Sequence, residues 1–386
     1  PAMNQQKSVA LLIETSNAYA RGLLAGIVSY MHEHLPWSIF LPEQERGATP
    51  PAWLKKWKGD GLIVRIETDT IAKAVLKLNV PIIDVSAARH VPDIPWVETD
   101  DGAIARLAAE HFLERGFEHL AYCGEPEFNW SNWREDMFSK CVSDASRSCH
   151  VFHSRSKHTR GFSMTHERRR LTTWIMSLPR PVGVFACYDI KAQQILDICR
   201  EQGIRVPEEL ALLGVDNDEL LCNLCTPPLS SIIPAANQAG REAARLLDIL
   251  MNGGSVSKEA NLLEPLGVAT RQSTDVLAID DTDIGAAVRY IRDHACEGIN
   301  VGHVLRAVPL SRRALETRFH SIVGRTPHEE ITRRRIEKIR QLLIDTDLTL
   351  AAIAQRTGFQ NVEYMSVAFR RAMDVPPGKY RRECSR

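Results

Sequence analysis

Polar side chains directly follow the apolar runs in the first two thirds of this 386-residue chain. Charged groups and hydroxyls of this kind hold the hydroxyls of sugars, and an aromatic face such as that of Trp130 or Trp133 can pack against the ring. The pattern therefore predicts a pocket for a polyhydroxylated ligand with the candidate residues Glu14, Ser16, Asp84, Ser86, Arg134, Tyr188, Asp189 and Asp216. An aspartate after a strand also commonly caps the next helix, and for Asp189 this alternative is equally good.

Apolar runs predict the strands that would position these side chains. They cover residues 9–13, 61–64, 80–85, 119–124, 182–187 and 210–215. Amphipathic stretches such as 103–115 and 191–202 lie between them and predict helices. Continuous apolar strands that alternate with helices indicate parallel sheets covered on both faces, whose ligands bind beyond the carboxyl ends of the strands. We therefore expect an α/β ligand-sensing domain over residues 1–268.

Two helix-turn-helix patterns follow one another near the end of the chain. Their expected helices cover residues 301–310 and 311–319 in the first unit, and 348–354 and 360–371 in the second. Ser311 and Asn361 are suitable N-caps, and Gly358 stands where a left-handed turn has to end a helix. Because such units place a helix N-terminus in a DNA major groove, we expect an all-α DNA-binding domain over residues 284–386.

A long helix is expected between the two units. Thr326-Pro327-His328-Glu329 forms a capping box with proline at the first helical position, and an apolar face continues to about Asp345. A helix of this length spans about 27 Å at ~1.5 Å per residue, near the ~34 Å between successive major-groove faces. One chain could therefore grip two adjacent turns of DNA without dimerising.

The distribution of charge supports DNA binding. From Ile284 onward the chain has 19 Lys and Arg against 11 Asp and Glu, whereas the whole chain balances at 48 of each. The net charge of zero for the whole chain therefore combines a basic C-terminal segment with an acidic remainder. Phosphate contacts need such a surplus and make affinity for DNA fall steeply with salt. A solvated helical face is the alternative, but the two helix-turn-helix patterns in the same segment favour DNA.

The C-terminal segment resembles the AraC-type regulator domain. The similar positions are Ile353-Ala354, Gly358-Phe359, Phe369-Arg370-Arg371, Val375-Pro376-Pro377 and Tyr380-Arg381. The resemblance implies base contacts from Arg312, Arg313 and Glu316 in one groove, and from Gln360, Asn361, Glu363 and Tyr364 in the next. Arginine pairs with guanine edges, and Asn or Gln with adenine, which fits these residue types. The aromatic residues Phe319, Phe359, Phe369 and Tyr380 fit a core better than a contact surface.

The first 268 residues resemble the periplasmic-binding-protein-like sensor of the lac-repressor family. The similar stretches are 183–192, 214–217, 228–232 and 240–244. The resemblance implies two lobes of parallel sheet, between which the chain crosses three times, near residues 116–119, 232–236 and 263–269. The polar segment 269–283 would then be the linker to the DNA-binding domain.

This sensor fused to a C-terminal AraC-type domain is similar to regulators of the xylose-operon activator type. The similarity runs nearly end to end and includes Arg21, Trp133-Arg134, 203–209, Asp216-Asn217, 271–275 and 290–296. It implies activation of a pentose operon when a monosaccharide binds. The implied partners are operator DNA, a second copy of the chain in a homodimer and, as a candidate, RNA polymerase.

The identity of the sugar stays open at this point. The loop Glu14-Thr15-Ser16-Asn17 carries more acid and hydroxyl than the Asn-bearing loop expected in xylose-operon activators, and Ala20 lacks a polar group. Whatever the sugar is, it can act on DNA binding only through its difference in affinity between conformations, typically ~1–3 kcal/mol.

Other functions are less well supported. A sugar-binding transport or receptor component without a DNA role needs an export signal, and the chain starts with no basic-plus-apolar leader. An enzyme needs a base with a nucleophile or cofactor partner, and no such motif or cofactor site is recognisable. Cys222-x-x-Cys225 lacks nearby ligands for a metal, and nine scattered cysteines fit a reducing cytoplasm. We therefore expect a cytoplasmic regulator without cofactor or metal.

Overall fold

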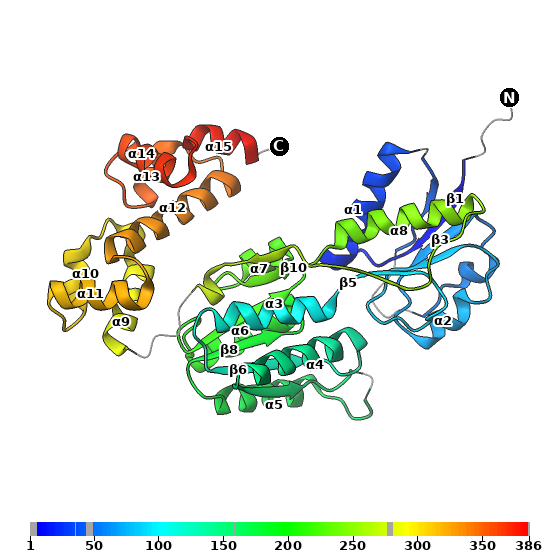
Figure 1. Cartoon of the computed structure of the whole chain (residues 1–386), viewed down its shortest axis with the longest axis horizontal. Coiled ribbons are helices and arrows are strands. Elements are labelled where there is room, and N and C mark those ends of the chain that lie inside the picture. Colours follow the sequence, from blue (N-terminus) through cyan, green and yellow to red (C-terminus); the bar gives the residue numbers. More distant parts are fainter. Residues whose placement is uncertain (1–5, 35, 44–48, 158, 276–280, 385–386) are drawn as a thin grey trace. The chain divides into compact units, whose positions relative to one another are not determined.

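The computed structural model describes residues 6–34, 36–43, 49–157, 159–275 and 281–384 (Figure 1). The chain divides into two compact units, Pro1–Ala278 and Ile279–Arg386. The described part of the first unit contains two sheets covered by helices, and that of the second consists of helices and their connections. This confirms the predicted combination of a two-lobed α/β domain with an all-α domain.

The first lobe is a parallel sheet with the strand order β11-β5-β4-β3-β1-β2. Its strands are β1 (Ser8–Leu12), β2 (Ser38–Phe40), β3 (Gly61–Val64), β4 (Ile82–Asp84), β5 (Trp96–Thr99) and β11 (Ala260–Leu263). Alternate residues of a strand point to opposite faces, so Val9 and Leu11 pack under α1 (Ala18–Glu33) and α8 (Ala236–Met251). Ala10 and Leu12 pack on the other face, under α2 (Asp69–Val75) and the short helix η1 (Ala52–Lys56).

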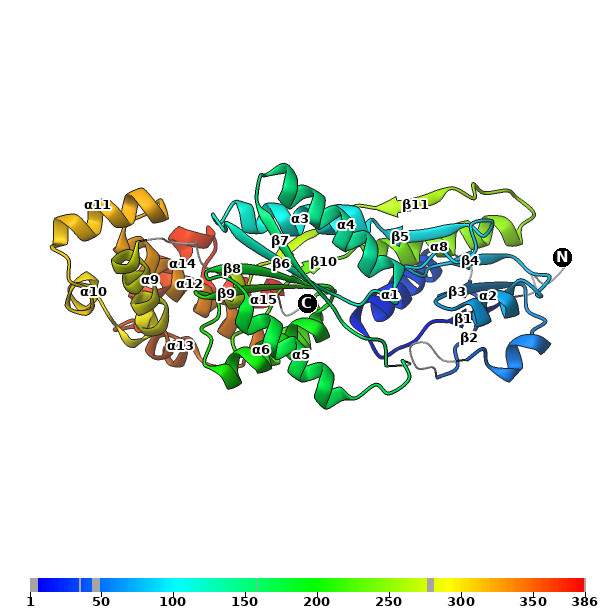
Figure 2. The same cartoon turned by 90° about the horizontal axis from the view of Figure 1, so that it is seen from below.

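The second lobe is a sheet with the order β12-β10-β9-β8-β6-β7, parallel except for the antiparallel strand β12. Its strands are β6 (His119–Gly124), β7 (Ser148–His153), β8 (Val182–Ala186), β9 (Leu210–Val215), β10 (Ser230–Ile233) and β12 (Gly267–Ala269). Figure 2 shows helices on both faces. One face carries α3 (Asp101–Leu113) and α4 (Asn129–Asp144), and the other carries α5 (Met164–Ser177), α6 (Asp189–Gln202) and α7 (Glu219–Leu224).

The chain crosses between the lobes three times, but the first crossing was predicted in the wrong place. The crossings after β10 and after β11 fall at 234–235 and 264–266, as expected. The first lies at Asp100, between β5 and α3, and not near 116–119. The reason is that Ile104, Ala108 and Phe112 of α3 already pack against the second sheet, so the whole helix belongs to the second lobe.

The polar run expected to open the linker is instead packed into the first unit. After β12 the chain forms the short helix η2 (Gln272–Thr274), in which Ser273 and Thr274 are fully buried. Ser273 Oγ donates to the carbonyl of Leu212 (2.6 Å), and hydroxyls with such partners can be buried at little cost. We call residues 270–275 the strap. Residues 276–280 of the expected linker 269–283 lie outside the described residues.

The second unit contains the predicted pair of helix-turn-helix motifs. Its helices are α9 (Thr282–His294), η3 (Ala295–Glu297), α10 (Val301–Ala307), α11 (Arg312–Val323), α12 (Pro327–Asp345), α13 (Leu350–Arg356), α14 (Val362–Met373) and α15 (Pro377–Cys384). Ser311 caps α11, Asn361 caps α14, and Thr326 and Glu329 form the capping box of α12, as predicted. Gly358 takes the expected left-handed conformation with φ of 72°. Within the described residues no helix combines the length and apolar character that a membrane crossing needs.

The long helix α12 supplies the core that joins the two motifs. The predicted apolar face is buried at Ile331, Ile336, Ile339, Leu342 and Leu343. Phe319 and Phe369 are fully buried as expected, while Phe359 and Tyr380 are partly buried against the core around the second motif. The aromatic residues are therefore core residues, as the sequence predicted.

Close packing of α1 against α8 depends on glycines. A Cβ at Gly240 would lie 2.0 Å from the carbonyl oxygen of Leu23, and one at Gly26 would lie 2.0 Å from that of Asn237. Backbone atoms cannot yield to such contacts as a flexible side chain can. The two helices can approach only because neither position carries a side chain.

We predict that Gly240→Ala destabilises the first unit by ~1–3 kcal/mol, because the added methyl overpacks the α1–α8 contact. Urea unfolding followed by circular dichroism would measure it. Gly285→Ala is the matched control, since a Cβ in that part of α9 would meet only an Arg289 side-chain atom at 3.8 Å. A parental unfolding midpoint in Gly240→Ala would contradict this account of the packing.

Candidate functional site

A cleft of about 390 Å³, partly open to solvent, lies where the carboxyl ends of both sheets meet. This is the place where ligands of parallel sheets bind. Residues of both lobes form its walls: Asn17, Tyr19, Arg65, Ala87 and Glu98 from the first, and Trp130, Arg134, Tyr188 and Asp216 from the second. A ligand held here would contact both lobes at once.

Three of the predicted ligand-binding residues line this cleft: Arg134, Tyr188 and Asp216. Of the two aromatic residues considered, Trp130 lies in the wall, whereas Trp133 packs edge-on against Trp96 with ring centroids 6.1 Å apart. The Tyr188 hydroxyl donates to Glu125 (3.2 Å). Three of the four candidates from the second lobe therefore face the cleft, and Asp189 is the one that does not.

The other five candidates do not line the cleft. Ser16 is exposed, and Ser86 is fully buried and accepts through its carbonyl from the indole of Trp96. Asp84 is also fully buried, where its Oδ1 accepts from the backbone of Ile66 (3.2 Å) and Ser86 (2.8 Å). These backbone bonds make Asp84 a support for the loop after β4, and burial raises its pKa to about 7.

Glu14 and Asp189 are also supporting residues. Glu14 is buried and forms an ion pair with Arg65. Asp189 accepts from Ser231 Oγ (2.6 Å) and from the backbone of Asp218 (2.9 Å), so it neither caps its own helix nor lines the cleft. Burial, followed by the nearby Asp216, raises the pKa of Asp189 to about 8.

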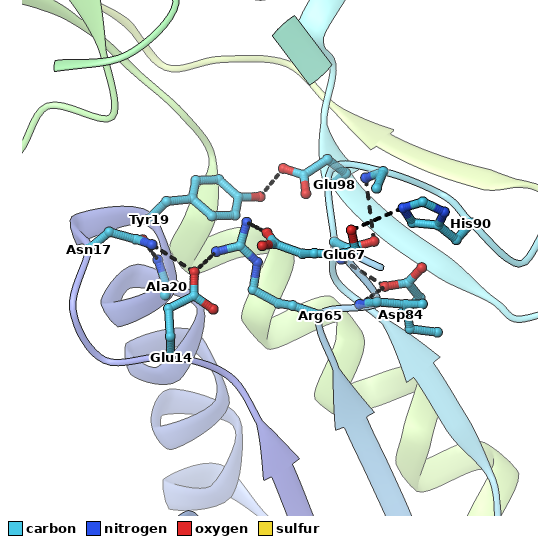
Figure 3. A network of polar contacts seen from close by, with 12 residues as sticks. Glu14, Asn17, Tyr19, Ala20, Arg65, Glu67, Asp84, His90 and Glu98 are labelled. Atoms are coloured by element: carbon cyan, nitrogen blue, oxygen red, sulfur yellow. Dashed lines mark hydrogen bonds and ion pairs between the residues drawn. The ribbon is translucent and has the colours of Figure 1, made fainter. Parts of the chain in front are cut away.

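The sequence pattern did not single out four other wall residues, Tyr19, Arg65, Ala87 and Glu98, whereas Asn17 belongs to the loop 14–17 that was expected beside the sugar. Figure 3 shows the guanidinium of Arg65 between Glu14 and Glu67, with Tyr19 and Glu98 beside it. Arg65 pairs with Glu67 at 2.6 Å, and its guanidinium carbon lies 5.5 Å from the centre of the Tyr19 ring. Because Arg65 directly follows the apolar run 61–64, the rule that selected the other candidates could have found it.

Glu98 is the most unusual group in the cleft. Its Oε1 accepts from the Tyr19 hydroxyl and from the backbone of Thr99, whereas its Oε2 is buried without a hydrogen-bond partner among the described residues. Burial, and then the charge of Asp101, raises the pKa of Glu98 to about 8. At neutral pH the carboxyl is therefore largely protonated and can both accept and donate a hydrogen bond.

Arg134 is a fixed cation on the opposite wall. Its Nε donates to Asp101 (2.7 Å) and its Nη1 to the carbonyl of Cys187 (2.5 Å), and its guanidinium lies 4.8 Å from the centre of the Trp130 ring. Burial alone would lower the pKa of Arg134, but Asp101 and Asp216 outweigh it and raise the pKa. Donors, acceptors and an aromatic face therefore stand preorganised around a space for a small polar molecule.

No group of three or more His, Cys, Asp or Glu suited to a metal ion occurs in the described ranges. Cys222 and Cys225 are both buried, and the thiol of Cys222 donates to Asp189 (3.5 Å). The cleft instead offers hydrogen bonds and one aromatic face, which is the chemistry of reversible binding.

The residues expected to contact DNA all lie at the exposed starts of α11 and α14. Arg312 donates to Glu316 (3.0 Å) one turn away, and Arg313 beside it is also exposed. Gln360 directly precedes α14, and Asn361 accepts from the backbone of Tyr364 (2.9 Å) as the N-cap. Glu363 and Tyr364 follow in the first turn and are exposed. Asn361 therefore has a structural role whether or not its amide reaches a base.

Arg335 of α12 connects the second motif to the start of the domain. It donates to the carbonyls of Ala295 (2.7 Å) and Ile299 (2.7 Å) around η3, and its guanidinium lies 5.5 Å from the centre of the Phe359 ring. A Cβ at Gly358 would lie 2.5 Å from the backbone nitrogen of Gly298, so the turn of the second motif packs tightly there. Both motifs are thus held to α12.

Comparisons with known families agree with this division. The chain matches "XylR N-terminal domain" over residues 8–102, "Periplasmic binding protein-like domain" over 109–274 and "Helix-turn-helix domain" over 304–383. It is 34% identical to the xylose operon regulatory protein of Escherichia coli (strain K12), over 97% of this chain and 96% of that protein. The corresponding protein of Haemophilus influenzae is 29% identical, over 98% and 99%.

Solved structures give the same result. The structure of the xylose-binding transcription activator xylR has a TM-score of 0.79 at 32% identity, covering 99% of this chain and 100% of that one. A regulatory protein of the LacI family from Chloroflexus aggregans, at 20% identity, has a TM-score of 0.57 over 69% of this chain and 98% of that one, and shares the fold. With two relatives aligned over nearly its full length, the chain belongs to the family of xylose operon regulatory proteins, and it is a transcription regulator and not an enzyme.

Proposed function

We propose that this regulator activates a pentose-utilisation operon when a monosaccharide of the xylose type binds in the cleft. The observation that carries the proposal is the buried Oε2 of Glu98, which lies in the cleft wall without a partner among the described residues. A buried unsatisfied polar atom costs ~1–3 kcal/mol, and a sugar hydroxyl would relieve that cost. The ring of the sugar would pack against Trp130 while Arg134 and Asp216 hold other hydroxyls.

The polar lining of the cleft and its charge pairing support a small neutral ligand. Donors and acceptors from both lobes surround one partly open space, as sites for small polar ligands require. The extra acid of the loop after β1 does not argue against xylose, because Arg65 neutralises Glu14 beneath the cleft. From that loop Asn17 lines the cleft, with its amide donating to Glu14 (2.7 Å).

In this proposal, sugar binding in the first unit acts on DNA binding by the second. Residues 6–275 would bind the sugar, and α9 to α15 would bind operator DNA through α11 and α14 in two adjacent major grooves. We further propose that the chain acts as a homodimer in the cytoplasm and contacts RNA polymerase at the promoter. The names of the relatives in Escherichia coli and Haemophilus influenzae support the operon assignment.

We predict that D-xylose raises the thermal unfolding midpoint, and that Asp216→Asn weakens its binding at least tenfold, because a charged acceptor is lost. Asparagine tolerates the positive φ of 104° at this position. Asp197→Asn, on the outer face of α6, is the control and should bind as the parent does. Isothermal titration with D-xylose, L-arabinose, D-ribose and D-glucose would measure both effects. The cleft assignment is wrong if Asp216→Asn keeps parental affinity for the sugar that binds.

We predict that Glu98→Gln flattens the pH dependence of stability between pH 6 and 9. The folded pKa of Glu98, about 8, lies above its ordinary value of 4.5, so the stabilising contribution of the protonated form is lost as pH rises through 8. Glutamine keeps the acceptor for Tyr19 but cannot ionise. Thermal midpoints across this range would test it, with Glu201→Gln on the surface as the control. Parallel profiles for parent and Glu98→Gln would refute the assignment.

We predict that Arg313→Ala and Gln360→Ala each reduce operator affinity by ~1–3 kcal/mol and relax the base preference in one groove only. A duplex selected from a random 40-base-pair library would serve as the operator, and fluorescence anisotropy would give the affinities. Arg200→Ala, in the ligand-binding unit, should leave DNA binding unchanged. A uniform loss over all sequences would show that the residue contacts phosphate and does not read bases.

A further inference from the structure

We infer that Arg271 is a positioning residue that couples the sugar cleft to the strap, and through it to the DNA-binding domain; this rests on the proposed function. Its partner is the loop Asp216-Asn217-Asp218, which we call the coupling loop. The loop follows β9 at the edge of the cleft, and the strap ends at Asp275, seven residues before α9 begins at Thr282.

Three consecutive residues of the coupling loop have three different kinds of partner. Asp216 lines the cleft. The Oδ1 of Asn217 accepts from Arg271 Nη2 (2.9 Å), at the start of the strap. The Oδ2 of Asp218 accepts from Nη2 of Arg21 (3.1 Å), which lies on α1 of the other lobe. One short turn therefore contacts the ligand space, the opposing lobe and the strap.

The coupling loop is held as a rigid unit. Asp216 and Asn217 have φ of 104° and 47°, a region that residues other than glycine rarely adopt and that persists only where many contacts enforce it. Asp189 supplies those contacts from below: it accepts from the backbone of Asp218 (2.9 Å) and from Ser231 Oγ (2.6 Å). Ser231 Oγ in turn accepts from the backbone of Asn217 (2.9 Å). Asn217 and Asp218 are therefore anchored to the same two side chains, and the backbone of Asp216 donates to the carbonyl of Ile232 (3.1 Å).

The strap is also fixed by hydrogen bonds other than the one between Arg271 and Asn217. Arg271 Nη1 donates to the carbonyl of Leu229 (3.0 Å), and the Arg271 backbone donates to Ser230 Oγ (2.8 Å). Thr274 Oγ1 donates to the same Ser230 oxygen (2.7 Å), and its carbonyl accepts from Arg115 Nε (3.0 Å). Because these groups are buried or half-buried, the strap follows the movement of its partners and does not slide over them.

These contacts form a continuous path from the cleft through the coupling loop to the strap. A sugar that contacts Asp216 and draws the lobes together changes the loop through Asp216 and through the Arg21–Asp218 pair. Asn217 transmits that change to Arg271, which belongs to the segment leading to α9. The lobe crossings at Asp100 and at 234–235 are the rival route, and in that case Arg271 would have a purely structural role.

Arg271→Met is the test, in the full-length chain with D-xylose as the probe. Methionine keeps most of the packing volume but removes the bond to Asn217. We expect D-xylose affinity and sugar-free operator affinity to stay within about threefold of the parent, while the effect of D-xylose on operator affinity falls below twofold. Hydrogen exchange of residues 268–275, slowed by D-xylose in the parent, should no longer respond.

Two further variants separate coupling from misfolding. Asn217→Gly removes the side chain where glycine tolerates the backbone, and should reproduce the loss of response, whereas Arg271→Lys keeps one donor and should restore part of it. Arg180→Met is the matched control, since Arg180 bonds the carbonyl of Ile175 at the end of α5 (2.9 Å). It should respond as the parent does.

A parental sugar response in Arg271→Met would overturn this inference and leave the proposed function standing. Loss of sugar binding, operator binding and stability together in Arg271→Met and Asn217→Gly would also overturn it, because that outcome is the signature of a structural role. If no pentose binds the parent chain, the proposed function fails and the inference fails with it.

Discussion

Burial of charge where the two lobes meet is the constraint on which the rest of this sensor depends. A guanidinium cannot be removed from water without carboxylates around it, and the chain buries two of them, Arg65 and Arg134, on opposite walls of one cleft. Each is balanced within its own lobe, by Glu14 and Glu67 in the first case and by Asp101 in the second. Neither of these two buried cations therefore depends on the other lobe for its counter-charge.

That arrangement explains why the cleft suits a neutral polyol. The charges are already satisfied, so they present hydrogen-bond donors and acceptors in fixed directions and do not demand a counter-ion. Two of these wall residues keep an atom without a hydrogen-bond partner among the described residues, Glu98 its Oε2 and Arg65 its Nε, and burial raises the pKa of Glu98 to about 8. A sugar hydroxyl can satisfy either protonation state of such a carboxyl, which an ionic ligand could not do equally well.

The DNA-binding domain depends on a different interaction, namely hydrogen bonds from side chains to backbone groups at the ends of its helices. Ser311, Thr326 and Asn361 each cap the start of a helix, and Arg335 satisfies carbonyls around η3. These local bonds fix where α11 and α14 begin, and so fix which residues stand at their exposed first turns. The connection from the cleft runs through buried hydroxyls and one arginine of the strap, in a segment whose polarity alone suggested a linker.

The sequence by itself determined whatever short-range physics controls: the apolar strands, the amphipathic helices, the caps, the turn at Gly358 and the two-motif domain. It also identified Arg134, Tyr188 and Asp216 as cleft residues. Only the tertiary structure decided that α3 belongs to the second lobe, that Ser273 is buried, and that Arg65 and Glu98 line the cleft while Glu14 supports them. The reason is that a buried polar group is defined by its partner, and these partners stand tens of residues away, where no local pattern can reveal them.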